Sequence, residues 1–343
     1  MITENLFSII NSGRNGGNIG ISTGLRIIDK YTYGIQKGWM TVIGGDTGSG
    51  KSSYVLFTSV YNTFANYLES LGTDNEFDVK YLIFSFEMSA EVLFAKILSM
   101  HLYYKYGVVI SYEEILSFKE PLSEDKYLLI QQEIEWIRLF ESKCLIHDKP
   151  CTSKQLYAIC KSWAETNGKF TELENGTETY EMNNKKLIPI VILDHIALLK
   201  LNTGHTKKQE IDECCDYLIW FRNKCNFCIY IVQQLNRNFK SMDRRKDKDH
   251  FELGLEDFSD SSGTVQAAEI VIAIYNPHRE KRSSFLEYVI KGGLGRVARG
   301  ICILKHRFGI ADQSLVVGFY GENSVWKQLP PPNLIDYEQF KTL

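Results

Sequence analysis

The stretch Met40-Thr-Val-Ile-Gly-Gly45-Asp-Thr-Gly-Ser-Gly-Lys51-Ser52 decides the fold of this chain. Its first residues form a compact apolar run that ends in glycine, which predicts a strand. From Gly45 onward it matches the pattern G-x-x-x-x-G-K-[ST] in full, and a helix is expected from about Lys51 to Leu71. Glycines let backbone N–H groups converge on phosphate oxygens, and the helix N-terminus adds the positive end of its dipole. The stretch therefore predicts a phosphate-binding loop that holds a nucleotide.

The residue types in this loop also predict the cofactors. Lys51 is expected to bridge the β- and γ-phosphates, and Ser52 to hold Mg²⁺. ATP and Mg²⁺ are therefore the predicted ligands. The residues expected to bind them are Gly45, Asp46, Thr47, Gly48, Ser49, Gly50, Lys51, Ser52 and Ser53.

Two carboxylates at the ends of apolar runs complete the predicted site. Ile190-Val-Ile-Leu-Asp194 places an acid at the tip of a buried strand, where the second metal-side carboxylate of a phosphate loop is needed. Glu87 follows the strand Leu82–Phe86, at the end where ligands of open α/β sheets bind, and is a candidate base. Two plainer interpretations stay open. Asp194 could be a helix N-cap or turn residue, and Glu87 a first-turn carboxylate favoured by the helix dipole.

The rest of the chain alternates apolar runs with amphipathic segments. Solid apolar strands separated by helices predict an α/β fold with a mostly parallel sheet covered on both faces. Further strands are expected at 81–86, 144–147, 188–193, 228–232 and 270–275, with antiparallel strands within 286–320. Helices are expected at 89–140 with a break near Pro121, at 152–166 and at 207–225. The expected organisation is a flexible leader at 1–20, one domain at 21–330 with a polar surface loop or hairpin at 167–186, and a tail at 331–343.

Composition excludes several classes of protein. In 343 residues, 44% are hydrophobic and 24% charged, which is ordinary for a soluble globular chain. Neither a long apolar run nor a signal sequence is visible, so no membrane span and a cytoplasmic location are expected. The net charge of −3 excludes a globally basic surface but not a local basic track.

The eight cysteines raise one metal hypothesis. Cys214-Cys215 and Cys225-x-x-Cys228 could suggest zinc, but adjacent ligands on a helix point about 100° apart, which suits a tetrahedral site poorly. Small core hydrophobes, kept reduced in a cytosol, are the favoured interpretation.

Six motifs in order resemble the helicase domain of DnaB-type replicative helicases, in the RecA-like ATPase superfamily. Beyond the phosphate loop, the resemblance is carried by Ser22–Gly38 as an entry segment, Leu82–Ser89 around Glu87, Asp194, Val232-Gln-Gln234-Leu-Asn-Arg237, Asp257–Glu269 and Lys305-His-Arg307-Phe-Gly309. His195 stands where the family usually has tyrosine. The family's N-terminal helical domain is not expected in this chain, an arrangement that a phage-like helicase would fit.

The resemblance implies a catalytic set of Glu87, Lys51, Gln234, Lys305 and Arg307. Glu87 would polarise water, Gln234 would sense the γ-phosphate, and Lys305 and Arg307 would reach the nucleotide of a neighbouring subunit. It therefore implies ATP hydrolysis in a homo-oligomeric, hexameric ring that translocates on single-stranded DNA, with primase or a loader as candidate partners. The alternative is a RecA-fold ATPase of the recombinase, mediator or regulatory type that uses ATP for assembly. A nucleotide kinase is disfavoured, because no arginine-rich lid is visible.

DNA binding is expected from a local track. The loop residues that would hold phosphates are Ser259, Ser261, Ser262 and Gly263, and the nearby cations are Arg237, Lys240, Arg244 and Arg245. Asp257 and Asp260 are expected to oppose this binding, and the family commonly has arginine where Ser259 stands. The stretch 240–248 could equally be a solvated loop of mixed charge.

Overall fold

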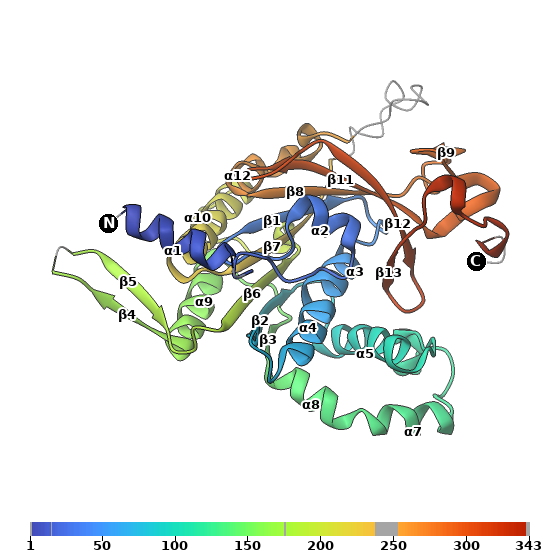
Figure 1. Cartoon of the computed structure of the whole chain (residues 1–343), viewed down its shortest axis with the longest axis horizontal. Coiled ribbons are helices and arrows are strands. Elements are labelled where there is room, and N and C mark those ends of the chain that lie inside the picture. The colour runs from blue at the N-terminus through green and yellow to red at the C-terminus, as the bar shows by residue number, and fades with distance from the viewer. Residues whose placement is uncertain (1, 15, 175, 237–252, 341–343) are drawn as a thin grey trace.

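A nine-stranded sheet organises the chain. The computed structural model describes residues 2–14, 16–174, 176–236 and 253–340 (Figure 1). The strand order is β13-β12-β11-β8-β1-β7-β6-β2-β3. The central strand β1, Met40–Gly45, pairs in parallel with β7, Cys228–Gln234, and with β8, Ile270–Tyr275. Strands β6, Leu187–Asp194, β2, Asp78–Ser85, and β3, Cys144–His147, continue the parallel part.

The C-terminal strands extend the sheet in antiparallel fashion. Strand β11, Ala298–His306, pairs antiparallel with β8, and β12, Gln313–Tyr320, and β13, Val325–Gln328, follow as hairpins. The predicted fold class is therefore confirmed: a mostly parallel sheet with antiparallel strands at its C-terminal end.

Side chains alternate between two cores because successive strand residues point to opposite faces. Val42 of β1 belongs to the core beneath α9, Ser153–Asn167, α10, Lys207–Cys225, and α12, Ser262–Ala267. Ile43 belongs to the core on the other face, under the helices that follow the phosphate loop (Figure 1). The segments α3, Lys51–Val55, η1, Leu56–Tyr61, and α4, Asn62–Ser70, form the helix predicted after the loop.

The helical stretch between β2 and β3 breaks where proline predicted it. Helices α5, Ala90–Tyr106, and α6, Tyr112–Ile115, precede Pro121, and α7, Glu124–Gln132, and α8, Ile134–Ser142, follow it. A buried carboxylate connects these two halves. Glu133 accepts hydrogen bonds from His101 and Lys105 of α5, at 2.6 and 2.7 Å.

The polar insertion at 167–186 is a hairpin, one of the two forms expected. Strands β4, Gly168–Glu172, and β5, Glu178–Met182, pair with each other and extend away from the main sheet (Figure 1). Tyr180 donates a hydrogen bond to the carbonyl oxygen of Ala164 in α9 at 3.0 Å. The hairpin also contacts the domain farther along its strands, because Phe170 stacks on Trp220 of α10 and Lys224 of α10 donates to the carbonyl oxygen of Glu178.

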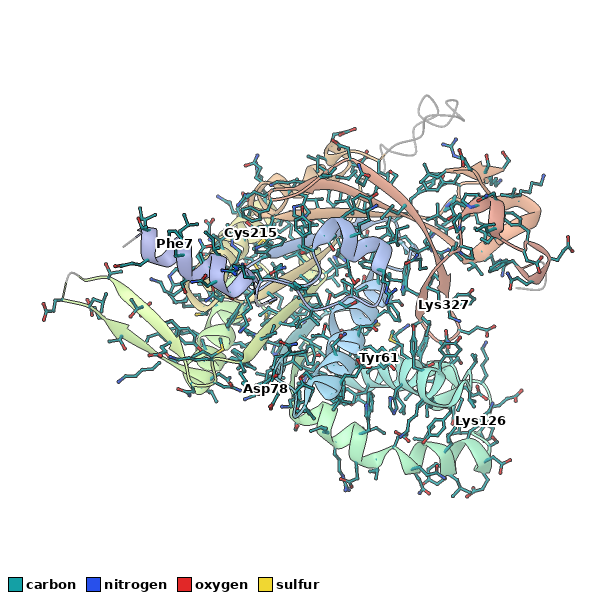
Figure 2. All side chains as sticks on the ribbon, in the orientation of Figure 1. Phe7, Tyr61, Asp78, Lys126, Cys215 and Lys327 are labelled. Carbon is teal, nitrogen blue, oxygen red and sulfur yellow. The ribbon has the colours of Figure 1, made fainter. Side chains whose placement is uncertain are left out.

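Two expectations about irregular regions were wrong. The leader forms helix α1, Ile2–Arg14, because Leu6, Ile9 and Ile10 recur at helical spacing among Asn and Ser residues that masked the pattern. Its apolar side chains are exposed, as Phe7 shows in Figure 2. Residues 290–294 form an irregular turn with non-helical backbone angles at Lys291, Gly292 and Gly293, residues 295–297 form one 3₁₀ turn, and long antiparallel strands begin only at β11.

The C-terminal residues are packed rather than a free tail as far as position 340. Phe340 is buried against a small core that includes Ile290 and Leu294. Tyr288 donates a hydrogen bond to the carbonyl oxygen of Pro330 at 2.9 Å.

The cysteines lie within the cores. Cys214, Cys215 and Cys225 belong to one core and Cys228 to the other, on the opposite face of the sheet, so the four do not share a tetrahedral site. Burial raises the pKa of the Cys215, Cys225 and Cys228 thiols to about 12. Figure 2 shows Cys215 on its helix, where it is 2% exposed, and the interpretation as core hydrophobes is confirmed.

Across the described part of the chain, no helix combines the length and apolarity that a membrane crossing requires.

Candidate nucleotide site

The phosphate loop connects β1 to α3 in a conformation that glycine makes possible. Gly48 and Gly50 have φ angles of +75° and +101°, which residues with a Cβ rarely adopt. A Cβ on Gly50 would also lie 2.9 Å from the Trp326 ring. The ammonium of Lys51 donates to the carbonyl oxygen of Asp46 at 3.0 Å, so the side chain folds back over the loop.

Lys51 is the positive centre of the site. It is 8% exposed, and burial lowers the pKa of its ammonium, while the carboxylates of Asp194, Glu87 and Asp46 act in the opposite direction. The hydroxyl of Ser49 is buried in the same loop without a hydrogen-bond partner among the described residues. A cradle of backbone N–H groups with a buried cation and an unsatisfied hydroxyl suits phosphate oxygens.

Strand register brings the two predicted carboxylates to this loop. Ser85 of β2 is the register partner of Asp194 of β6, and the N–H of Phe86 donates to the Asp194 carbonyl oxygen at 2.7 Å. Glu87 therefore follows β2 at the same sheet edge, next to the end of β6. Parallel strands end at one edge, which is why sequence spacing predicted this meeting.

Asp194 has the properties of a metal-side carboxylate. It is 5% exposed, and burial raises its pKa to about 6, although a hydrogen bond from Ser52 opposes this rise. Its Oδ1 has no hydrogen-bond partner within the described residues. An orphaned buried carboxylate oxygen beside a hydroxyl is a donor set that fits Mg²⁺. The helix N-cap interpretation fails, because Asp194 is the last residue of β6 and the short helix after it begins beyond His195.

His195 contacts the candidate base. Its Nε2 lies 3.1 Å from Oε1 of Glu87, and the two side chains are 7% and 44% exposed. Burial lowers the pKa of His195, and the charge of Glu87 acts against this. Sequence comparison marked His195 only as a departure from tyrosine and did not predict the contact. The available signal in the sequence was that His195 directly follows Asp194, the last residue of the strand that pairs with β2.

Gln234 lies at the mouth of the same site. It is the exposed last residue of β7 and the register partner of Gly45, where the phosphate loop begins. Its neighbour Gln233 points inward and accepts a hydrogen bond from Thr264 at 3.0 Å. The alternation of the strand thus assigns opposite environments to two adjacent glutamines.

Arg299 supports the phosphate loop from β11 and was missed in the sequence. Its Nε donates to the carbonyl oxygen of Ser49 at 2.9 Å, and its Nη1 donates to the carbonyl oxygens of Arg296 and Ala298. The guanidinium lies 5.0 Å from the Phe319 ring centroid and is buried, which lowers its pKa to about 10. The only signal in the sequence was an arginine at the start of an apolar run, and this pattern did not indicate which residue the guanidinium contacts.

Lys305 and Arg307 lie at the opposite edge of the sheet. Lys305 donates to the carbonyl oxygens of Val265 and Gln266, both at 2.8 Å, and Arg307 pairs with Glu269 at 2.7 Å. Glu269 also accepts from the N–H of Met40, the first residue of β1. The length of β1, roughly 17 Å at about 3.3 Å per residue, therefore separates these cations from the phosphate loop of their own chain.

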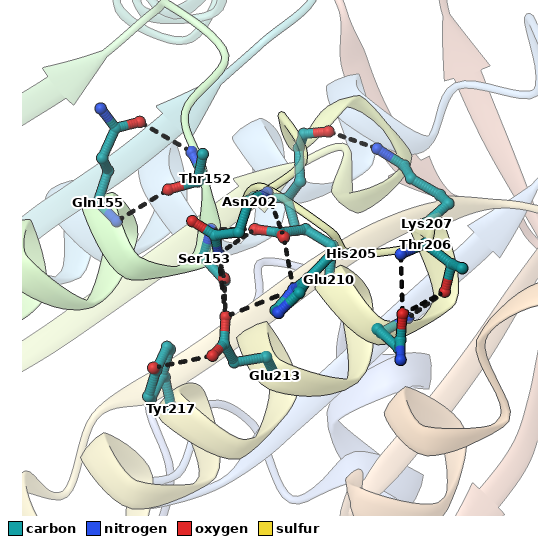
Figure 3. A network of polar contacts seen from close by, with 12 residues as sticks. Thr152, Ser153, Gln155, Asn202, His205, Thr206, Lys207, Glu210, Glu213 and Tyr217 are labelled. Carbon is teal, nitrogen blue, oxygen red and sulfur yellow. Dashed lines mark hydrogen bonds and ion pairs between the residues drawn. The ribbon is translucent and has the colours of Figure 1, made fainter.

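A polar network holds the loop that follows Asp194. Figure 3 shows Glu210 and Glu213 of α10 facing Ser153 and Asn202. Glu210 is fully buried and accepts hydrogen bonds from the N–H groups of Ser153 and Asn202 at 2.6 and 2.8 Å. Burial acts to raise the pKa of Glu210, but these hydrogen bonds lower it. His205 also contacts Glu210, yet the carboxylate oxygens are already used by N–H donors, so we assign the network a structural role.

The predicted DNA loop is only partly described. Arg237, Lys240, Arg244 and Arg245 lie outside the described residues, and of Ser259, Ser261 and Ser262 only the backbone is described. That backbone forms the turn η4, Leu255–Ser261, and the start of α12, which contains Gly263. Asp257 is 1% exposed and accepts from the N–H of Gly254 at 2.9 Å. The expectation that Asp257 repels DNA phosphates was therefore wrong, because its carboxylate is turned inward.

A phosphate loop on the central strand of a parallel sheet, with two carboxylates at the adjacent strand ends, defines a RecA-like nucleotide-binding domain. The family model described as DnaB-like helicase C terminal domain matches residues 20–326, and the chain belongs to this family.

Comparison with curated proteins gives the same family. The chain is 26% identical over 276 residues to the replicative DNA helicase DnaB of Rickettsia prowazekii (strain Madrid E), across 80% of this chain and 50% of the relative. It is 26% identical over 278 residues to the DnaB of Helicobacter pylori (strain J99 / ATCC 700824), across 80% of this chain and 48% of that protein. The chain thus spans about half the length of these relatives.

Solved structures share the fold. One solved ATPase domain superposes with a TM-score of 0.70 at 17% identity, covering 96% of this chain and 99% of that one. A DnaB-like replicative helicase, solved in a study of its interactions with primase, gives 0.67 at 17% identity, covering 96% of this chain and 67% of the other.

Proposed function

We propose that this chain is the ATP-hydrolysing motor of a ring-shaped replicative DNA helicase that translocates on single-stranded DNA. The observation that carries the proposal is the division of the catalytic set between two edges of one sheet. Lys51, Asp194 and Glu87 meet at one edge, and Lys305 and Arg307 lie at the other. A complete site then needs two chains arranged head to tail, and such an interface closes into a ring.

The residues of one chain divide the work of phosphoryl transfer. Lys51 and the loop N–H groups bind the phosphates, and Ser52 and Asp194 would hold Mg²⁺, which neutralises phosphate charge when bound. Glu87 accepts a proton from the attacking water. Gln234 reads the presence of the γ-phosphate from the mouth of the site. Arg307 and Lys305 of the neighbouring subunit supply positive charge as the transition state forms.

Single-stranded DNA and further copies of the chain are the proposed partners. The exposed apolar side chains of α1 support association, because contiguous exposed apolar surface commonly marks an interface. Primase or a loader remains a candidate partner, since one structural relative was solved in a study of its interactions with primase.

The proposal is tested by measuring ATP hydrolysis with and without single-stranded DNA, together with the mass of the assembly in the presence of ATP. We expect DNA-stimulated hydrolysis by a hexamer. If the protein is a monomer or dimer and DNA does not stimulate its ATP hydrolysis, the result would instead support a RecA-fold ATPase that uses ATP for assembly. Duplex unwinding with a tailed fork substrate then tests translocation directly.

A further inference from the structure

The contact between His195 and Glu87 is the least explained feature of the site. The imidazole Nε2 and the carboxylate Oε1 are 3.1 Å apart, within hydrogen-bond distance. The histidine side chain is 7% exposed, whereas the side chain of Glu87 is 44% exposed. A buried group therefore holds a solvent-facing carboxylate.

The backbone on both sides of this contact is well defined. Glu87 follows β2 in a turn where the Ser85 hydroxyl donates to the carbonyl oxygen of Met88 at 2.7 Å. His195 precedes a short helical turn in which the N–H of Leu198 donates to the His195 carbonyl oxygen at 3.0 Å. The polar network of Figure 3 then holds the remainder of this loop against α9 and α10. The two side chains thus meet because both backbones are fixed.

The contact also assigns the proton on the imidazole. An ionised carboxylate can only accept hydrogen bonds, so Nε2 must carry the hydrogen. The other ring nitrogen, Nδ1, is buried and has no hydrogen-bond partner among the described residues. With the hydrogen on Nε2, the imidazole can donate toward Oε1 of Glu87, which lies 3.1 Å away.

We propose that His195 is a positioning residue for the base Glu87. Its Nε2–H holds Oε1, which leaves Oε2 to receive the proton when water attacks the γ-phosphate and ADP departs. A base must lie within hydrogen-bond reach of the proton it takes, and an exposed glutamate has many rotamers that do not satisfy this. The inference rests on the proposed ATPase function and adds a residue that positions its base.

Two substitutions separate the hydrogen bond from the space that His195 fills. His195→Leu removes the N–H donor at similar volume, and His195→Gln keeps an N–H donor. We expect His195→Leu to lower kcat for ATP hydrolysis by about tenfold or more, equivalent to about 1.4 kcal/mol. The Kd of a fluorescent ATP analogue with Mg²⁺ should stay within about threefold, and His195→Gln should recover most of kcat.

A double-mutant cycle identifies Glu87 as the group through which His195 acts. In a Glu87→Gln background, His195→Leu should cause no further loss of kcat, since the base is already absent. Equal losses in both backgrounds, or wild-type kcat in His195→Leu, would overturn the proposal. A loss of kcat in His195→Gln as large as that in His195→Leu would also overturn the proposal.

His101 offers a matched control. It is also buried and pairs through Nε2 with a glutamate, Glu133, at 2.6 Å, but in the helical layer between β2 and β3. His101→Leu should lower the thermal unfolding temperature and leave kcat unchanged. A fall in kcat equal to that of His195→Leu would mean that loss of any buried histidine–glutamate pair slows hydrolysis, and the proposal would be wrong.

A spectroscopic readout keeps this test independent of the proposed function. In protein labelled with ¹⁵N-histidine, the long-range NMR correlations of His195 should show the Nε2–H tautomer, and Glu87→Ala should shift them. Unchanged His195 signals in Glu87→Ala would overturn the pairing, even if the protein hydrolyses no ATP. Absence of DNA stimulation with the expected signals would count against the helicase proposal alone.

Discussion

The guanidinium of Arg299 donates a hydrogen bond from Nε to the main-chain carbonyl oxygen of Ser49, at 2.9 Å, and so connects the antiparallel strand β11 to the phosphate loop. The two residues are 250 positions apart in the chain. Further hydrogen bonds from Nη1 to the carbonyl oxygens of Arg296 and Ala298 fix the plane of the guanidinium. The antiparallel extension therefore shapes the nucleotide site.

Loss of this connection should weaken nucleotide binding. Arg299→Met keeps much of the side-chain volume but removes every donor, and Arg299→Lys cannot reproduce the fork geometry. Since hydrogen bonds from charged groups contribute about 1.5–3 kcal/mol, we expect ATP affinity to fall by about tenfold or more in both variants. Titration with a fluorescent ATP analogue measures it. Arg296 is exposed and lies in the turn just before β11, so Arg296→Met should bind normally, and equal affinity in all three variants would contradict the assigned role.

Substitutions of Lys51 and of Glu87 should impair different steps of the reaction. Lys51→Ala should abolish tight binding of ATP with Mg²⁺, because it removes the point charge on the phosphates. Glu87→Gln should bind ATP normally and lose turnover by roughly 10²-fold or more, since only the base is removed. Equilibrium binding and steady-state hydrolysis, measured on the same preparations, distinguish these outcomes. Hydrolysis at the wild-type rate in Glu87→Gln would place the base elsewhere.

Arg307 should act on a neighbouring subunit. Arg307→Ala should still bind nucleotide but hydrolyse it more slowly, by up to the roughly 10³-fold attributed to arginine fingers. Mixing Arg307→Ala with Glu87→Gln protomers should restore part of the activity, because some interfaces then join an intact Arg307 to an intact Glu87. Native mass spectrometry of the mixture is the control that tests whether mixed rings form. Mixed rings without recovered activity would argue against action between subunits.

The buried carboxylate of Glu133 should make the helical layer sensitive to acid. Burial acts to raise its pKa, but hydrogen bonds from Lys105, Tyr106 and His101 outweigh burial and lower it from 4.5 to about 2. Because the folded pKa is depressed, this stabilisation is present above the unfolded pKa and is lost as pH falls through the interval from 4.5 to about 2.

Glu133→Gln should therefore lower the unfolding temperature strongly at pH 7 and much less near the bottom of that interval. Circular dichroism melts across this pH range measure the difference. Glu135→Gln is the control, because Glu135 is exposed and pairs only with Arg138 among the described residues. A constant difference between Glu133→Gln and wild type at all pH values would show that the stabilisation comes from packing alone.

DNA binding should depend on salt and not on sequence. Replacing Arg244, Arg245 and Lys246 with alanine should flatten the slope of log affinity against log salt, by about 0.7 for each phosphate that is no longer neutralised. Fluorescence anisotropy with single-stranded oligonucleotides of two unrelated sequences, in the presence of an ATP analogue, measures it. An unchanged slope would leave the loop around Gly263, with Arg237 or Lys240, as the main contact. Absence of single-stranded DNA binding by the unsubstituted protein at low salt, with the ATP analogue and assembled rings present, would contradict the helicase proposal.

Local patterns were enough to predict most of the fold. The apolar runs at 144–147 and 270–275 and the helix at 207–225 match β3, β8 and α10 residue for residue, because buried parallel strands and long helices have strong periodic signals. Segments with weak periodicity were predicted incorrectly. In α1, polar and glycine residues hid the helical spacing of Leu6, Ile9 and Ile10, and after Tyr288 the apolar residues pack in turns rather than strands.

The sequence by itself determined the phosphate loop and the carboxylates Glu87 and Asp194, because a motif and the end of a strand are local features. Only the tertiary structure decided what lies around them. Strand register brought His195 against Glu87, the antiparallel extension brought Arg299 under Ser49, and strand direction carried Arg307 to Glu269 at the far edge. Such contacts depend on which strands become neighbours, and neighbouring strands are chosen by the packing of the whole sheet rather than by any single segment.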